Sequence, residues 1–362
     1  MKVLIINPIL YTCESSDIKK VDSIKDCMIC DLCEAFSELD CSVTLAASSL
    51  FKPSKQESYP FEIVWFDNVC PKLFKPNCLP LLKGLNRYLK TNIDSYDLVI
   101  SSEVFSVNTF IAYRAIKDKL IIWHELAKHN SIMHKLPSKI WYNVVARFGM
   151  RNAKVVARSV EAREFIRSFM PNVDDEIIEH GVNLNKFRVS SQIKNQFIVC
   201  SQLISRKQVD GIISNFFQYL SKYDQNACLY IVGDGELKES LQILATDLRI
   251  KENVIFTGQL SHAELLPVLS DSQALLVNTR QDNNMVSIVE AIACGVPVLT
   301  TEIPYNSSYI KGEGLGIAKT GWTEDDLNLM VENHSKFRAA CLNYRDSLST
   351  INKAKAFIRF VK

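Results

Sequence analysis

The chain has 362 residues, of which 47% are hydrophobic and 23% charged, so its composition is that of a folded globular protein and excludes a disordered or fibrous one. Its length predicts two domains. The formal net charge of +2 is far from the basic excess of a dedicated nucleic-acid-binding protein, and we expect no nucleic-acid partner. Glycine is scarce, with 12 residues, about 3% against an average of roughly 7%.

The first half of the chain alternates short apolar runs with amphipathic segments, of which 24–39 is predicted to be a helix. This alternation is the pattern of βαβ units around a parallel sheet. The predicted strands are 3–6, 43–47, 63–66, 98–101, 120–123 and 155–157.

The same alternation restarts after the turn at Gly181-Val182-Asn183, which predicts a second α/β domain. We place the boundary near residues 184–195, between a first domain of residues 1–185 and a second of residues 186–345. The end of the chain, 346–362, contains a basic amphipathic helix that is expected to pack back on the first domain. The predicted strands of the second domain are 197–201, 229–232, 254–256, 274–277 and 298–300.

The number and spacing of the cysteines have two interpretations. Eleven cysteines, an odd number in a chain without a recognisable export signal, favour free buried thiols over a disulfide framework and predict a cytoplasmic protein. Cys27, Cys30 and Cys33 have the spacing of three iron–sulfur ligands, but the next cysteine, Cys41, is not followed by the usual proline. We favour buried thiols on one helix face and keep a metal or redox protein as an alternative.

A histidine directly follows the predicted strand 120–123. His124 and His129 are five residues apart, whereas a zinc-protease helix needs a spacing of four, so we exclude that site. Ligands of open parallel sheets bind beyond the carboxyl ends of strands, which makes His124 a candidate by position. A single histidine is more often a core or surface residue, and both interpretations stay open.

Residues 196–310 contain the most informative pattern. Each predicted strand there is followed by a polar turn that opens a helix, so several strand ends converge on one crevice. Helix N-termini offer free N–H groups and the positive ends of helix dipoles, which suits a nucleotide diphosphate. Lys207 follows a strand by a few residues and is the candidate phosphate cation.

Two acidic residues stand eight positions apart near the end of this region. If a helix begins near Met285, Asp282 lies in the preceding loop and Glu290 about a turn and a half inside the helix. The two acids can then hold two ends of one polyhydroxylated ligand, with the free amides of Met285, Val286 and Ser287 between them.

These motifs occur in a recognisable order: Leu203-x3-Lys207, Gly233-x-Gly235, Phe256-x-Gly258, and then Asp282-x7-Glu290 with Ala, Gly and Pro after it. The order resembles the C-terminal domain of the retaining GT-B glycosyltransferases, of the group 1 or family 4 type. The resemblance implies two Rossmann-like domains with an inter-domain cleft, in which 1–185 is the acceptor side and 186–345 binds the nucleotide sugar.

The resemblance also implies roles for individual residues. Glu290 matches the acid that binds the nucleotide ribose, Lys207 the residue that holds the donor diphosphate, and Asp282 the acid that binds donor-sugar hydroxyls. His124 matches the histidine that approaches the donor sugar near the reacting carbon. The remaining donor-binding positions are the backbone amides of Met285, Val286 and Ser287, and Leu260 beside the base.

Several positions depart from the family pattern. Gln202 stands where an arginine is usual, so one diphosphate cation is missing unless Arg206 turns inward. Gln208 and Met285 stand where glycine is usual, and Asp282 is one methylene shorter than the usual glutamate. The loop after the first strand also lacks the Gly-Gly that many relatives place around the donor phosphates.

We therefore expect a retaining glycosyltransferase that moves a sugar from a nucleotide-diphosphate sugar to a hydroxyl of a glycan or lipid-linked saccharide, in bacterial surface polysaccharide synthesis. Lys207 and the amides of 285–287 would stabilise the leaving diphosphate, while His124 and Asp282 orient the sugar. We expect no cofactor and no metal, because no suitable Asp-x-Asp pattern is present. The alternatives are a GT-B epimerase or phosphorylase, and a non-catalytic nucleotide-sugar-binding partner of another transferase.

Residues 135–167 carry eight Lys or Arg against two Glu, with aromatic residues between them. One interpretation is two amphipathic helices with solvated charged faces. The other is a patch that binds an anionic membrane surface and holds the enzyme at the inner face of the membrane.

Overall fold

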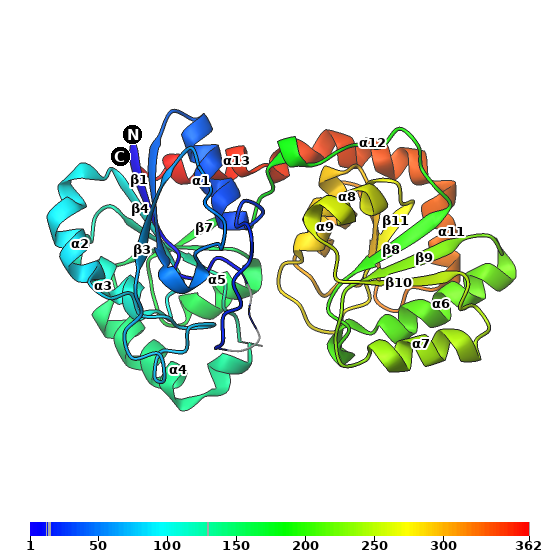
Figure 1. The fold of residues 1–362 in the computed structure, drawn as a ribbon, viewed down its shortest axis with the longest axis horizontal. Helices are drawn as coiled ribbons and strands as arrows, with labels where there is room; N and C mark the ends of the chain where they lie inside the picture. The colour runs from blue at the N-terminus through cyan, green and yellow to red at the C-terminus, as the bar shows by residue number, and fades with distance from the viewer. Residues whose placement is uncertain (12, 14–15, 129, 362) are drawn as a thin grey trace. The chain divides into compact units, whose positions relative to one another are not determined.

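The computed structural model describes residues 1–11, 13, 16–128 and 130–361, with the side chain of Ser131 also outside the description. It divides into two compact units, residues 1–183 with 350–362, and residues 184–349 (Figure 1). Each unit is a parallel sheet with helices on both faces, as the sequence predicts. His129 and Lys362 lie outside the described residues.

The first unit has a seven-stranded sheet in the order β3-β2-β1-β4-β5-β6-β7. All of its strand pairs are parallel in the described residues, and the strand order reverses between β1 and β4. The strands are β1 (Lys2–Ile6), β2 (Ser42–Ser48), β3 (Glu62–Phe66), β4 (Leu98–Ser102), β5 (Leu120–His124), β6 (Lys154–Ala157) and β7 (Val173–Ile177).

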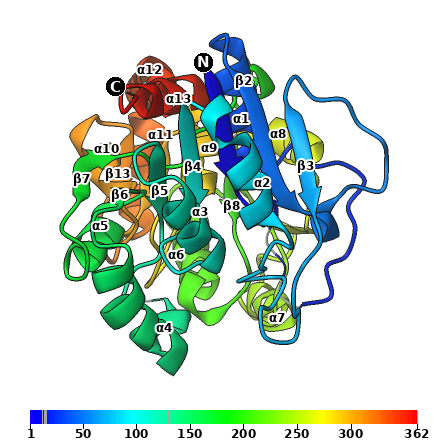
Figure 2. The same cartoon turned by 90° about the vertical axis from the view of Figure 1, so that its left-hand side faces the viewer.

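Helices cover both faces of this sheet. The core on one face includes residues of α1 and α13, and the core on the other includes residues of α2, α3, η4 and α5 (Figure 2). The helices are α1 (Met28–Glu38), α2 (Leu85–Asn92), α3 (Val107–Ala115), α4 (Leu136–Ile140), the π-helix η4 (Trp141–Gly149), α5 (Val160–Arg167) and α13 (Thr350–Ile358), with short 3-10 turns η1 (Ser49–Phe51), η2 (Ile93–Ser95) and η3 (Ser131–His134).

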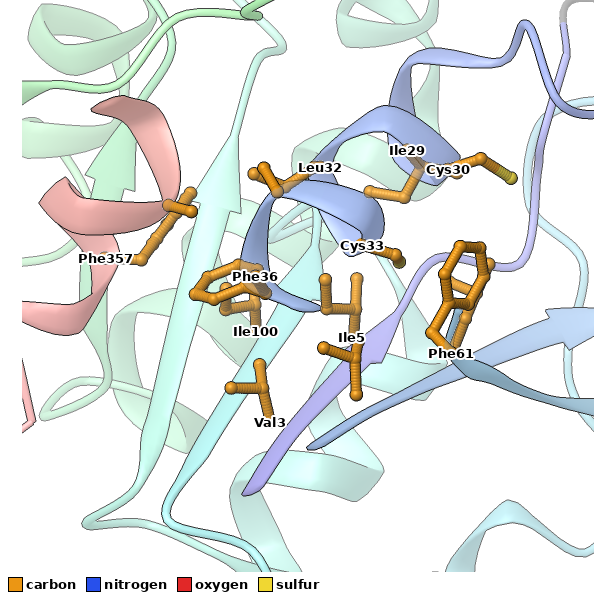
Figure 3. Close-up of a cluster of buried hydrophobic side chains, with 14 of the residues drawn as sticks. Val3, Ile5, Ile29, Cys30, Leu32, Cys33, Phe36, Phe61, Ile100 and Phe357 are labelled. Carbon is orange, nitrogen blue, oxygen red and sulfur yellow. The ribbon is translucent and has the colours of Figure 1, made fainter. Parts of the chain in front are cut away.

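The three-cysteine segment belongs to the core. Cys30 and Cys33 are fully buried on the face of α1 that packs on the sheet, among the apolar side chains drawn in Figure 3. Cys27 is the N-cap of α1, with its Sγ 2.9 Å from that of Cys30. Within the described part of the chain, no group of three or more His, Cys, Asp or Glu side chains is arranged to hold a metal ion.

The C-terminal helix α13 packs back on the first unit, as the sequence predicts. The Phe357 ring lies 6.4 Å from that of Phe36 on α1 and 5.4 Å from that of Trp123 on β5 (Figure 3). Lys353 also forms a buried ion pair with Glu179 at 3.3 Å. The apolar contacts and this ion pair fix the helix to the first sheet.

The second unit has a six-stranded parallel sheet in the order β10-β9-β8-β11-β12-β13. Its strands are β8 (Gln196–Cys200), β9 (Cys228–Val232), β10 (Val254–Gly258), β11 (Ala274–Leu276), β12 (Val298–Thr300) and β13 (Gly316–Ala318). Its helices are α6 (Val209–Lys222), α7 (Lys238–Asp247), α8 (His262–Ser270), α9 (Val286–Ala293), α10 (Ser307–Gly312), α11 (Glu324–Glu332) and α12 (His334–Tyr344), with 3-10 turns η5 (Leu184–Lys186), η6 (Ser205–Lys207) and η7 (Arg345–Leu348). No helix among the described residues is long and apolar enough to cross a membrane.

Candidate functional site

The strand order of the second sheet reverses between β8 and β11, which are direct neighbours. In open parallel sheets the chain leaves toward opposite faces at such a point, and ligands bind beyond the carboxyl ends of the two strands. Residues 201–208 follow β8 and residues 277–285 follow β11. These two loops contain five of the candidate residues that the sequence singles out: Gln202, Arg206, Lys207, Asp282 and Met285.

An ion-pair cluster joins the two loops. The Lys207 ammonium and the Arg206 guanidinium both contact the Asp282 carboxylate, Arg206 at 3.0 Å. Arg206 also donates to the backbone carbonyl of Gln281 at 2.8 Å, which holds its guanidinium at the Asp282 loop while its side chain stays 39% exposed. The Lys207 and Asp282 side chains are only 10% and 16% exposed.

Burial has an electrostatic cost for Lys207. Burial lowers the pKa of its ammonium below the ordinary lysine value, while the adjacent Asp282 carboxylate opposes that shift and Arg206 adds to it. Two cations share one carboxylate, so the cluster carries an excess of positive charge at neutral pH. It is therefore suited to binding a further anion. Gln202 is exposed and belongs to no hydrogen bond of this cluster in the described structure.

The helix α9 begins at Val286, so Asp282 lies in the preceding loop and Glu290 lies within the helix, as the sequence predicts. The backbone amide of Met285 differs from the expectation of a free donor. It donates to Oδ1 of Asn306 at 2.6 Å, because the loop after β12 brings that side chain against the start of α9. The amides of Val286 and Ser287 are the first two of the helix, where no intrahelical acceptor exists.

Glu290 faces a residue that the sequence reasoning missed. Its Oε1 lies 3.7 Å from Nε2 of His262, and both side chains are mostly buried, at 17% and 20% exposure. His262 is the first residue of α8 and comes two positions after Leu260. The only sequence signal was the capping box Ser261-x-x-Glu264, which marks the start of that helix.

One departure from the glycine pattern, at Gln208, can be compared with a position where glycine is kept. Gln208 adopts a left-handed conformation (φ 47°) at the N-cap of α6, a conformation that glycine adopts without steric cost. Gly233, after β9, has φ 142°, and a Cβ there would stand 1.9 Å from the carbonyl oxygen of Ser201. At Gly233 the backbone after β9 contacts the backbone after β8, so a side chain would clash and glycine is kept. At Gln208 the requirement is a left-handed φ, which glutamine adopts here.

The first unit has a cavity of about 360 Å³ at the carboxyl ends of β1, β4 and β5. We name it the polar cavity because the carboxylates of Glu103 and Glu125 stand in its otherwise largely apolar lining. Glu103, directly after β4, lines it and has a left-handed backbone (φ 70°). Its carboxylate accepts from the amide of Glu125 at 2.8 Å and contacts Nδ1 of His124 at 3.0 Å. A non-glycine residue held in this conformation at a cavity is a frequent feature of functional sites. Glu103 is therefore a candidate that sequence reasoning missed.

His124 does not line this cavity. Its imidazole is fully buried beneath Glu103, 6.3 Å from the ring of Phe165 and 6.4 Å from that of Tyr142. This burial differs from the expectation that the imidazole meets the donor sugar directly. The reason is the strand register: His124 is the last residue of β5, pairs with Ala157, and points into the apolar core. In this structure it can act on a ligand only through Glu103.

Beside Glu103 lies a second buried charge cluster. Arg158 donates to Glu125 Oε2 and to His180 Nε2, each at 2.7 Å, and stacks over the ring of Trp123 at 3.7 Å. Burial alone would raise the pKa of Glu125, but Arg158 and His180 hold it well below its usual range. Burial and Arg158 lower the pKa of His180, in keeping with a neutral imidazole that accepts from Arg158.

Comparison with solved structures shows the class of fold. The crystal structure of Anabaena HepE in complex with UDP covers 99% of this chain and 99% of its own length, with a TM-score of 0.68 at 15% identity. The chain therefore has the two-unit α/β architecture of the GT-B glycosyltransferases.

Comparison of sequences is more specific. Residues 184–331, almost all of the second unit, match the family of glycosyl transferases group 1. The O-antigen chain mannosyltransferase RfbU of Salmonella typhimurium is 24% identical over 46% of this chain and 47% of its own length. A GDP-mannose-dependent α-(1-6)-phosphatidylinositol monomannoside mannosyltransferase of Mycolicibacterium smegmatis is 32% identical over 40% of this chain and 42% of its own length. The chain thus spans about half the length of these relatives, and the matches support a GT-B glycosyltransferase of group 1.

The ion-pair cluster predicts an asymmetry between two substitutions. Asp282→Asn leaves the buried Lys207 without its counter-ion and should lower the free energy of unfolding by about 3 kcal/mol. Lys207→Met should cost less than about 1 kcal/mol, because Asp282 keeps Arg206 as a partner and an apolar chain replaces the buried ammonium. Urea unfolding of both variants measures the difference. Equal costs would contradict the geometry described.

Proposed function

We propose that the chain is a retaining glycosyltransferase that transfers a sugar from a nucleotide-diphosphate sugar to a hydroxyl of a glycan or lipid-linked saccharide. The observation that carries this proposal is the cluster of Lys207, Arg206 and Asp282 at the strand reversal of the group 1 domain. The UDP in the HepE complex and the GDP-mannose in the name of the mycobacterial relative support a nucleoside-diphosphate donor.

The donor diphosphate would be held mainly by charge. Lys207 and Arg206 share the single carboxylate of Asp282, so together they carry one positive charge more than Asp282 neutralises. A diphosphate can therefore bind to both cations while Asp282 stays in place. The amides of Val286 and Ser287 and the positive end of the α9 dipole would add charge-assisted hydrogen bonds. Asp282 would then accept a hydrogen bond from a sugar hydroxyl while it keeps its ion pair with Lys207. Met285 would contribute only its side chain, because its backbone amide donates to Asn306.

The nucleoside would lie next to the diphosphate. Glu290 accepts hydrogen bonds from the two ribose hydroxyls in this proposal, and His262, 3.7 Å away, holds the carboxylate in place. Leu260 would contact the base with its main chain. Gln202 is exposed, and we assign it no contact with the diphosphate.

The chemical step needs stabilisation of the leaving diphosphate more than a protein nucleophile. Lys207 and the helix amides would stabilise the negative charge that develops as the anomeric C–O bond breaks. The leaving phosphate would take the proton of the acceptor hydroxyl on the same face, which retains the anomeric configuration. We propose that this reaction uses neither a metal ion nor a cofactor.

The first unit would supply the acceptor site. Glu103 is one acid of the polar cavity, and its carboxylate is fixed by the Glu125 amide and by His124. It can accept a hydrogen bond from an acceptor hydroxyl. We assign His124 a positioning role, through Glu103, in place of direct contact with the sugar. The O-antigen relative supports a place in the synthesis of bacterial surface polysaccharide.

A non-catalytic nucleotide-sugar-binding partner remains the second candidate. The observations that favour it are the exposed Gln202 and the occupied Met285 amide, which together remove two donor contacts expected of an active enzyme. Tight binding of a nucleotide sugar, with no transfer of its sugar to any acceptor tested, would support the non-catalytic candidate.

Donor binding tests the proposed site. UDP, GDP or ADP at roughly 100 times its Kd should add about 2.7 kcal/mol to the free energy of unfolding, measured as a rise in Tm. Lys207→Ala should weaken binding about 10- to 100-fold, because a charge-assisted contact to phosphate is lost. Lys251→Ala, at an exposed lysine in the same unit, is the matched control and should leave binding unchanged. Equal binding by both variants would place the diphosphate elsewhere.

We also propose that the first unit binds an anionic membrane surface through α4 and η4. Leu136, Ile140, Val144 and Phe148 are 53% to 72% exposed and stand four residues apart. In η4 the backbone bonds run i→i+5, as from the Met150 amide to the Val145 carbonyl, which widens the turn and keeps this row nearly straight. A parallel row, Lys135, Lys139, Arg147 and Arg151, supplies the positive charge.

The rest of the basic segment does not join this surface. Arg163 and Arg167, on α5, pair with Glu164, and Arg167 also pairs with Asp175. The membrane-binding region we propose is therefore 135–151, shorter than the 135–167 that charge counting indicates.

Vesicle binding tests this surface. Lys135→Gln with Lys139→Gln should weaken binding to anionic vesicles about 30-fold, since each basic residue near such a surface contributes about 1 kcal/mol. Arg163→Gln with Arg167→Gln removes the same charge at paired positions and should have little effect. Co-sedimentation at low and high salt measures both. Equal losses in the two double variants, or no salt-sensitive binding of the native chain, would contradict the proposal.

A further inference from the structure

The first unit contains a second cavity, apolar and larger than the polar one. From its lining we infer that it binds the hydrocarbon chain of a lipid phosphate, the carrier part of the acceptor. This inference rests on the proposed function and names the acceptor class. The cavity measures about 470 Å³, within the range of small-ligand sites of roughly 300–1,000 Å³.

The walls of this cavity are apolar and well anchored. Leu73, Phe74, Val107 and Trp141 line it, together with Phe105, which packs edge-on against Trp141 at 5.8 Å. The indole N–H of Trp141 donates to the carbonyl of Val104 at 2.8 Å, so its polar group is satisfied away from the cavity. These aromatic and aliphatic side chains, with the indole N–H bonded elsewhere, favour a hydrocarbon over a sugar or a peptide backbone on this part of the wall.

The same cavity has two cationic residues in its lining. Lys75 and Lys135 both line it, one from the loop after β3 and the other from the start of α4. Residues 68–84 and 130–151, which build this side of the unit, contain seven Lys or Arg and no Asp or Glu. A single hydrocarbon chain with a phosphate at its head matches this combination of apolar walls and locally basic segments.

The apolar cavity adjoins the polar one. Both are lined by Cys78, Leu79, Phe105, Ser106 and Ile132. A lipid chain in the apolar cavity would therefore place the groups attached to its phosphate in the polar cavity, where Glu103 accepts hydrogen bonds from hydroxyls. This order of chain, phosphate and sugar is that of a lipid-phosphate-linked saccharide.

The helix α4 connects this cavity with the proposed membrane surface. It contributes Pro137 and Ser138 to the lining, while Leu136 and Ile140 on the same helix are exposed at 69% and 53%. The same short helix thus presents apolar side chains to solvent and lines the cavity. The free-energy cost of moving the hydrocarbon chain out of the bilayer is then offset by its apolar contacts in the cavity.

The test uses the full chain and a dodecyl phosphate that carries bromine on its chain. Bromine quenches tryptophan fluorescence at contact, so binding should quench Trp141, and Trp141→Phe should abolish the quenching while calorimetry still detects binding. Dodecanol should bind more weakly than dodecyl phosphate, and inorganic phosphate should not compete. Lys75→Gln with Lys135→Gln should remove the preference for the phosphate over the alcohol, whereas Arg at both positions should keep it.

A filling substitution locates the chain. Val107→Phe adds bulk to the cavity wall at the first residue of α3 and should weaken binding of dodecyl phosphate roughly tenfold, as if about two methylene groups were displaced. Val160→Phe is the matched control, because Val160 is also the first residue of a helix with a serine N-cap and lies outside the cavity. Equal affinities of the two variants, or binding without quenching of Trp141, would overturn the assignment.

Two further outcomes are informative. A concentration-dependent dimer that dodecyl phosphate dissociates would place a second copy of the chain on this cavity and overturn the assignment. Tm shifts with UDP, GDP and ADP, measured on Val107→Phe, separate the two proposals. Retained nucleotide binding with no lipid-phosphate binding in the native chain rejects the lipid site alone, whereas lipid-phosphate binding with no nucleotide binding rejects the proposed donor site.

Discussion

The ion pair between Lys207 and Asp282 is the interaction on which the second unit's proposed chemistry depends. It ties the loop after β8 to the loop after β11, the two segments that diverge where the strand order reverses. Burial of the ammonium would be unfavourable without the carboxylate, and the carboxylate in turn holds the guanidinium of Arg206 beside it. The cluster thus keeps two cations close together before any anion arrives, which is the preorganisation that electrostatic stabilisation of a leaving diphosphate requires.

In the first unit, too, neighbouring groups hold a candidate functional side chain in place. Glu103 is held by a backbone amide and by the buried His124, while Arg158 fixes Glu125 and His180 beside it. Glu103 and Glu125 both line the polar cavity, and Glu125 is the acid that pairs with Arg158. The adjoining apolar cavity and the exposed row on α4 and η4 lie outside this network. In our proposal the carboxylates meet the polar groups of the acceptor, and the apolar cavity and exposed row meet its lipid.

Much of the fold follows from sequence pattern because eleven of the thirteen strands in the described residues contain short, mostly apolar runs between turns. β7 and β13 were missed for physical reasons: β7 has the sequence Val-Asp-Asp-Glu-Ile at a sheet edge, and β13 has three residues that begin with a glycine. The predicted strand at 63–66 was found although β3 is also an edge, because its residues are apolar.

The sequence predicted which loops form the site, but it did not predict the individual contacts of the side chains and amides within them. Spacing along the chain placed Lys207 and Asp282 beyond neighbouring strand ends, since parallel strands bring their carboxyl ends to one edge. It could not show that Asn306, on another loop, takes the amide of Met285, or that the register of β5 buries His124 behind Glu103. Both depend on contacts between segments far apart in the sequence. At one position where relatives use glycine, Gln208 adopts the left-handed conformation itself.

The most direct test of the proposed activity is turnover of a nucleotide sugar by the purified chain, with the products separated and the new linkage read by NMR. We predict that nucleoside diphosphate is released in proportion to the glycosylated lipid-phosphate acceptor formed, with the anomeric configuration of the donor retained and with no loss of rate in a chelator. Release of a free or epimerised sugar without acceptor, inversion at the anomeric carbon, or dependence on a divalent metal would contradict that prediction.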